Sequence, residues 1–140
     1  MTMARLQLRA ATLVVLAQIL RRLRGTTHAL RRLHRIRRPT IPVDPAAAML
    51  AVQRAGRVAR ARCLAQSVAL AALLDQEAHD IVVVLGCRLY ADGRWGSHAW
   101  VLYGGQMLEP VTADEHTPLA RYSAEHNWVP VAPPAAPRVS

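Results

Sequence analysis

The sequence predicts an α+β fold in which N-terminal helices pack on a small antiparallel sheet. In the first half, apolar residues recur at intervals of three and four, which is the spacing of a helix face. In the second half, β-branched runs and glycine-containing turns indicate strands and hairpins. A length of 140 residues suits one domain, and an aromatic content of 4% without phenylalanine means that leucine, valine and alanine fill its core.

Residues 1–43 are predicted to form a basic amphipathic helical segment followed by a linker. One or two helices are expected over residues 6–37, with a break at Gly25-Thr26-Thr27. We expect this segment to pack on the rest of the domain and to keep its arginines in water. Docking on a partner protein or a membrane surface is the alternative. The apolar positions of this segment are Leu13, Leu16, Leu20, Leu23, Leu30 and Leu33.

The net charge of +9 is concentrated near the N-terminus, because ten arginines precede the first acidic residue, Asp44. Such a basic half predicts an acidic partner, which could be nucleic acid, anionic lipid or an acidic protein or peptide. Residues 10–20 resemble the apolar centre of a signal peptide, but no small-residue cleavage site follows, and the run is too short to span a bilayer. We therefore expect a cytoplasmic protein with free thiols at Cys63 and Cys87.

Two further helices are predicted after the linker. Asp44-Pro45 has the form of an N-cap followed by proline at the first helical position, so a helix should begin there and end near Gly56. A second helix with an apolar side is expected over residues 63–75. These helices and the strands that follow make up the predicted core domain, residues 44–128, and residues 129–140 are expected to form a Pro/Ala-rich, poorly ordered tail.

The predicted sheet begins with residues 81–85, a continuous hydrophobic run that suits a strand covered on both faces. Gly86 after it indicates a close approach of another group. Residues 98–103 read as a second strand, and Gly104-Gly105 is predicted to turn the chain back into residues 106–109. The sheet is therefore expected to be antiparallel.

Cysteine chemistry is indicated by Cys63, which lies where the second core helix is predicted to begin. A cysteine nucleophile reacts as the thiolate, which a nearby imidazole and the N-terminal end of a helix both favour. Arg60 and Arg62 precede Cys63, and the small residues Ala65 and Ser67 leave room for a strand to pack close. A small buried core residue is the structural alternative for Cys63.

His98 opens the second predicted strand, where its ring can lie near a helix N-terminus packed across the sheet. It would then serve as the base of a Cys–His pair; a structural histidine is the alternative. A turn at Gly104-Gly105 pairs residue 98 with residue 111 and puts Glu109 on the same face, where its carboxylate could orient the imidazole. Asp114 competes for this role, and Glu109 would otherwise be an ordinary exposed hairpin residue.

These motifs resemble a known family. Cys63-Leu64-Ala65-Gln66-Ser67-Val68-Ala69-Leu70, Gly86-Cys87-Arg88, His98-Ala99-Trp100-Val101 and Leu108-Glu109-Pro110 are similar to those of the leader peptidase of lasso-peptide biosynthesis, a cysteine protease of the transglutaminase-like superfamily. The resemblance covers residues 60–122. It implies a papain/transglutaminase-like fold and a cysteine endopeptidase that removes the leader from a ribosomally made precursor.

The resemblance also implies roles and partners. Cys63 matches the family's nucleophile, His98 its histidine and Glu109 its third member, which is usually aspartate. The family works beside a small leader-binding protein and an ATP-dependent macrocyclase. We expect no cofactor and no metal. Trp100 is expected to point away from His98 and to serve packing, while His116 and His126 are too scattered among non-ligands to suggest a metal site.

The oxyanion hole is expected to include the backbone N–H of Cys63, with Gln53 and Gln66 as possible side-chain donors.

Two other interpretations of the sequence compete with the peptidase. The arginine-rich helices alone suit a protein that binds nucleic acid or a membrane surface, although no nucleic-acid motif accompanies them, so we expect no nucleic-acid partner. The second competing interpretation is a transglutaminase-like scaffold with a vestigial triad, and the intact Cys63 and His98 count against it.

Overall fold

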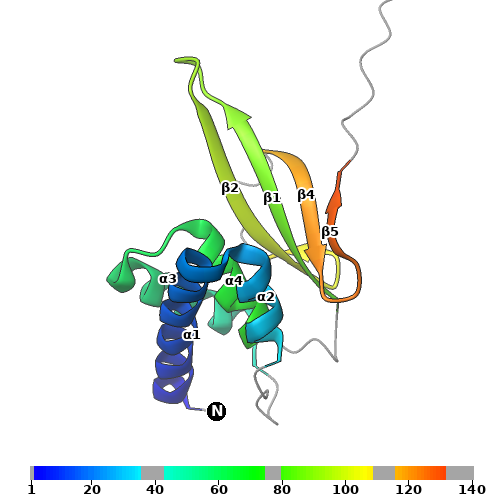
Figure 1. The fold of residues 1–140 in the computed structure, drawn as a ribbon. Coiled ribbons are helices and arrows are strands. Elements are labelled where there is room, and N and C mark those ends of the chain that lie inside the picture. The colour runs from blue at the N-terminus through cyan, green and yellow to red at the C-terminus, as the bar shows by residue number, and fades with distance from the viewer. Residues whose placement is uncertain (1, 36–42, 75–79, 109–115, 132–140) are drawn as a thin grey trace, which may run out of the picture.

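The computed structural model describes residues 2–35, 43–74, 80–108 and 116–131. In this part of the chain, four helices precede a five-stranded antiparallel sheet, which confirms the α+β fold (Figure 1). The elements are α1 (Met3–Arg24), α2 (Thr26–His34), α3 (Pro45–Ala59), α4 (Cys63–Leu73), β1 (Ile81–Leu89), β2 (Trp95–Tyr103), β3 (Gln106–Met107), β4 (Thr117–Ser123) and β5 (Asn127–Pro130).

The N-terminal helices separate where the sequence predicts a break. Gly25, at φ 84°, ends α1 and begins α2, because this left-handed conformation is easily reached only by glycine. Leu13 of α1 and Leu33 of α2 are buried in the same core as Val52 of α3 and Leu73 of α4. The basic segment therefore contributes to the hydrophobic core that residues 44–128 form, rather than lying on its surface alone.

Helix α1 is longer than the apolar run read from the sequence. It has 22 residues, and by length and composition alone it could cross a membrane. The prediction that this region is too short to span a bilayer was therefore wrong, since the helix extends on both sides of residues 10–20. The same test is passed by a core helix of a soluble protein, and the buried Leu6, Ala10 and Leu13 show that one face of α1 packs on protein.

Helix α3 begins at the predicted cap. The Asp44 carboxylate accepts a hydrogen bond of 2.9 Å from the backbone N–H of Ala47, and Pro45 occupies the first helical position. The helix continues to Ala59, past the predicted end at Gly56, and Arg60 terminates it in the left-handed conformation at φ 52°. The N–H of Ala61 then donates to the carbonyl of Gly56 at 2.8 Å, which turns the chain sharply toward α4.

The sheet has the strand order β3-β2-β1-β4-β5, so that β1 lies at its centre. The predicted turn at Gly104-Gly105 is present, and Leu102 opposite Met107 gives the register expected for this hairpin. Strands β4 and β5 were not anticipated. The tail was predicted from residue 129, but β5 continues through Pro130 and the N–H of Val131 donates to the carbonyl of Leu119 at 2.9 Å. Residues 132–140 lie outside the described residues.

Both faces of β1 are covered, as predicted. Val83 faces the helices and Val84 faces away from them, and each side chain is only 1% exposed. On the helix side, Val101 belongs to the main core. On the other side, the indole of Trp100 covers Val84 in a small separate cluster. Val82, Leu102 and Met107 pack against these two residues, so side chains of the sheet itself cover this face in the described part of the chain.

Gly86 is required by this arrangement, which gives a first testable prediction. A Cβ atom at residue 86 would lie 2.7 Å from the Trp100 ring and 2.9 Å from the backbone carbonyl oxygen of Thr117. We expect Gly86→Ala to lower the free energy of unfolding by about 1–3 kcal/mol, since a rigid ring and a strand must both move. Urea denaturation measures the change, and Ser97→Ala at an exposed position of β2 is the control, with an expected effect within about 0.5 kcal/mol.

Candidate active site

Cys63 is the first residue of α4, as the sequence predicts. Ser67, one turn after Cys63 on the same side of the helix, is buried, and so is Ala65, so α4 packs close to β2. Arg62 occupies the N-cap without a side-chain hydrogen bond, and the first turn carries no acidic residue. The N–H groups of this turn therefore have no acceptor within the helix and can receive a negatively charged oxygen beside the Cys63 thiol.

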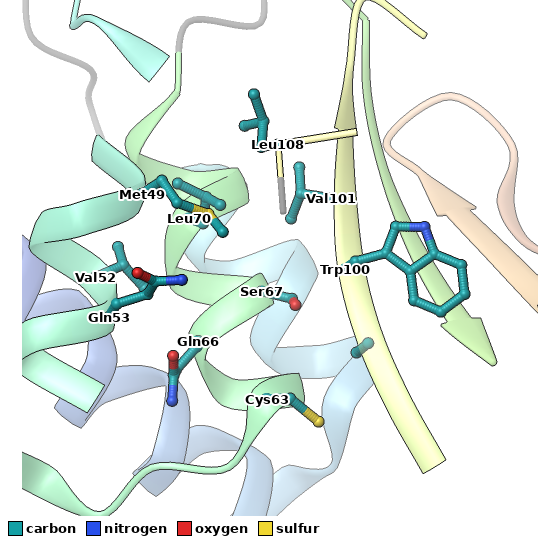
Figure 2. A pocket seen from close by; sticks show the side chains of 11 residues that line it. Met49, Val52, Gln53, Cys63, Gln66, Ser67, Leu70, Trp100, Val101 and Leu108 are labelled. Atoms are coloured by element: carbon teal, nitrogen blue, oxygen red, sulfur yellow. The ribbon is translucent and has the colours of Figure 1, made fainter. Parts of the chain in front are cut away.

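A cavity of about 150 Å³ opens between α3, α4 and β2 next to this thiol (Figure 2). Its walls are about equally polar and apolar, and the polar side chains besides Cys63 are Gln53, Gln66 and Ser67. Figure 2 shows Gln53 on α3 and Cys63 at the start of α4, with the Cys63 sulfur pointing toward β2. The remaining lining residues are Met49, Val52, Leu70, Ala99, Trp100, Val101 and Leu108.

The two glutamines have different roles. The side-chain amide of Gln66 donates a hydrogen bond of 2.8 Å to the carbonyl of Ala61, and its aliphatic part lies over Gly56. Gln66 therefore holds the connection from α3 to α4, which fixes where Cys63 begins its helix. This contact leaves Gln53 as the better candidate for a side-chain donor to an oxyanion in the cavity.

His98 lies on β2, next to the residue of this strand that lines the Cys63 cavity. Ala99, the residue after His98, lines that cavity together with Cys63. The His98 ring itself stacks on Trp100, with 6.0 Å between ring centroids and an interplanar angle of 24°. Because alternate residues of a strand share a face, His98 and Trp100 lie on the side away from the helices. The expectation that Trp100 points away from His98 was therefore wrong, whereas its packing role is confirmed by an exposure of 4%.

His116 is the residue at this site that sequence reasoning missed. Its ring centroid lies 5.1 Å from that of His98 and 6.4 Å from that of Trp100. The contact arises because Gly86 of β1 lies between His98 of β2 and Pro118 of β4, and Cys87 lies opposite Thr117. His116 comes one residue before this pairing with β1. No local pattern marks His116, since the pairing joins segments that are far apart in the sequence.

The predicted third member, Glu109, lies outside the described residues, and so does its competitor Asp114. The residue before Glu109 is described: the N–H of Leu108 donates to the carbonyl of Val101 at 3.2 Å, which continues the register of the β2–β3 hairpin by one residue.

The other cysteine, Cys87, is a free thiol like Cys63. It lies opposite Ser97, on the strand face that Ala99 shares.

Cys63 begins a helix that packs on β2, whereas the His98 ring lies on the opposite face of that strand, so the structure does not bring these two predicted residues together. The sequence matches the Transglutaminase-like superfamily over residues 6–124, and the chain belongs to this superfamily, whose members are typically cysteine-protease-like. The match includes α1 and α2 and runs to the end of β4. Comparisons with curated proteins and with solved structures find no match.

Proposed function

We propose that this protein is a cysteine endopeptidase that removes the leader from a ribosomally made lasso-peptide precursor. The observation that carries the proposal is Cys63 at the uncapped N-terminus of α4, beside a cavity and against the strand that bears His98. Membership of the transglutaminase-like superfamily supports the cysteine chemistry. The likeness of the Cys63 and His98 motifs to those of the leader peptidase supports the substrate class.

In the proposed mechanism, the Cys63 thiolate attacks the carbonyl carbon of the scissile peptide bond. The N–H groups of the first turn of α4 and the amide of Gln53 stabilise the oxyanion that forms. His98 gives its proton to the leaving amine, so the bond breaks and a thioester remains on Cys63. Water then hydrolyses the thioester, and Glu109 is proposed to orient the imidazole.

The face of the β1–β2 hairpin next to Cys63 offers a surface for an extended peptide. Figure 1 shows this hairpin projecting beyond the helices. Trp95 shares a face with Ala99 and pairs with Leu89, and the two side chains are 71% and 55% exposed. Trp95 lies about 13 Å along the strand from Ala99, a span of four residues in an extended peptide. We infer that this surface contacts the precursor at some distance from the bond that is cleaved.

The proposal is tested by mixing the full chain with a lasso-peptide precursor and its leader-binding protein and following the free leader by mass spectrometry. Release of the intact leader is the expected result. No release from precursors that a known leader peptidase cleaves under the same conditions would overturn the proposal. The leader-binding protein is proposed to be needed because the described residues form one small helix-and-sheet unit with little surface for specificity, and full activity without it would contradict this requirement. The macrocyclase would act on the released core peptide.

A non-catalytic scaffold is the second candidate, and one observation favours it. The His98 ring lies on the face of β2 that Trp100 shares, away from the cavity that Cys63 lines. Treatment with iodoacetamide separates the candidates. An activated thiolate at Cys63 should be alkylated much faster than the half-buried Cys87, whereas a scaffold should show similar rates at both cysteines.

A further inference from the structure

Helix α1 presents an apolar stripe to solvent. The stripe consists of Leu8, Val15, Ile19 and Leu23, whose side chains are 71%, 44%, 46% and 73% exposed. Their spacing places them along one side of the helix, with the uncharged Thr12 between the first two. Together these residues form a continuous ridge about 22 Å long.

The stripe is unusual because the other side of α1 is already buried. Leu6, Leu13 and Val14 pack in the main core. A helix at the surface of a soluble domain normally places charged residues on the side opposite to its buried face. Between Arg9 and Arg21, α1 has no charged residue at all. Its outward side is therefore an apolar surface that nothing in the described part of the chain covers.

Arginines stand at both ends of the stripe. Arg5 lies before Leu8, and Arg22 and Arg24 lie on either side of Leu23; all three are exposed. No acidic residue occurs before Asp44. A second copy of the chain could not cover the stripe favourably, because a two-fold contact would bring arginine clusters of like charge together. The occupant must carry negative charge at both ends of an apolar surface.

We propose that this stripe docks the protein on an anionic lipid bilayer, with α1 lying in the plane of the interface. A bilayer is fluid and receives a convex ridge without a matching groove, and arginine side chains reach from the helix ends to lipid phosphates. Although α1 is long and apolar enough to span a membrane, its buried face is packed against α3 and α4 in the folded protein. The helix therefore lies on the membrane and does not cross it. This docking is independent of the chemistry proposed for Cys63.

Vesicle co-sedimentation of the full chain tests the proposal. At low salt, the wild type should bind vesicles of equal parts phosphatidylglycerol and phosphatidylcholine at least about tenfold more tightly than vesicles of phosphatidylcholine alone. Binding should weaken as salt is added, because screening reduces the attraction of the arginines. Failure of the wild type to bind the anionic vesicles at low salt would overturn the proposal and would leave an acidic protein as the occupant of the stripe.

Two variants separate the stripe from net charge. Leu8→Glu combined with Ile19→Glu should lower vesicle binding about tenfold or more. The matched control, Leu119→Glu combined with Val129→Glu, adds the same charge at exposed positions of β4 and β5. This control should retain most of the wild-type binding. Equal loss in both would refute the role of the stripe. If the glutamate variant of α1 misfolds by circular dichroism, Leu8→Ser combined with Ile19→Ser replaces it, and wild-type binding by that variant would equally refute the role.

Discussion

Replacing Cys63 with alanine is expected to abolish leader release, with a loss of about a thousandfold or more in the single-turnover rate. The proposed mechanism has no second nucleophile at the start of α4, so a variant without the thiol cannot form the thioester. Cys63 is only half-buried, and the change removes one atom, so the fold should be retained. Quantitative mass spectrometry of the released leader measures the rate, and circular dichroism checks the fold.

The second free cysteine provides the matched control. Cys87→Ala makes the same chemical change in a half-buried residue of β1. This variant should release the leader within about twofold of the wild-type rate, because the proposed mechanism uses no thiol of β1 and the change removes no reacting atom. Cleavage by Cys63→Ala at the wild-type rate would show that the peptidase assignment is wrong.

The parts of the fold that the sequence predicts correctly are those with local signals. The Asp44 cap, the glycine break after α1 and the Gly104-Gly105 turn each depend on residues a few positions apart. Such signals act through backbone conformation and short-range hydrogen bonds. Both depend on residues close together in the sequence, so a local sequence pattern can predict them. The place of Cys63 was predictable for the same reason, since it follows from where α4 begins.

The parts that the sequence did not predict depend on distant segments. Strand β4 alternates weakly, contains Pro118 and has one buried residue, Tyr122, so its pattern does not mark a strand until it pairs with β1. The contact between His116 and His98 follows only from that pairing. Likewise, Gln66 could be read as an oxyanion donor until its hydrogen bond to the Ala61 carbonyl became visible.

The position of Trp100 shows a different limit. The two-residue period of a strand already places His98 and Trp100 on one face, so the wrong expectation came from the application of the pattern and not from a missing signal. The consequence for the site is substantial. The stacked pair puts the imidazole on the outer side of β2, while Ala99 between them meets the Cys63 cavity. The proposed role of His98 therefore requires β2 to turn this face toward the thiol when substrate is bound, because the ring and the thiol lie on opposite sides of the strand.

Replacing His98 with alanine is accordingly expected to lower the single-turnover rate of leader release by about a hundredfold to ten-thousandfold. Without the imidazole, the Cys63 thiol has no base and the leaving amine has no proton donor. The same mass-spectrometric assay measures the loss. His126→Ala is the control, because this histidine lies exposed in the turn between β4 and β5 and should leave the rate unchanged.

His116 makes the test of His98 decisive. Its ring is 5.1 Å from that of His98, so a second imidazole is available in the same cluster. If His98 is the base, His116→Ala should lower the rate by less than His98→Ala, since it would change only the surroundings of the reacting ring. A near-normal rate for His98→Ala together with a large loss for His116→Ala would transfer the role of base to His116. Normal rates for both variants would remove the histidine cluster from the mechanism.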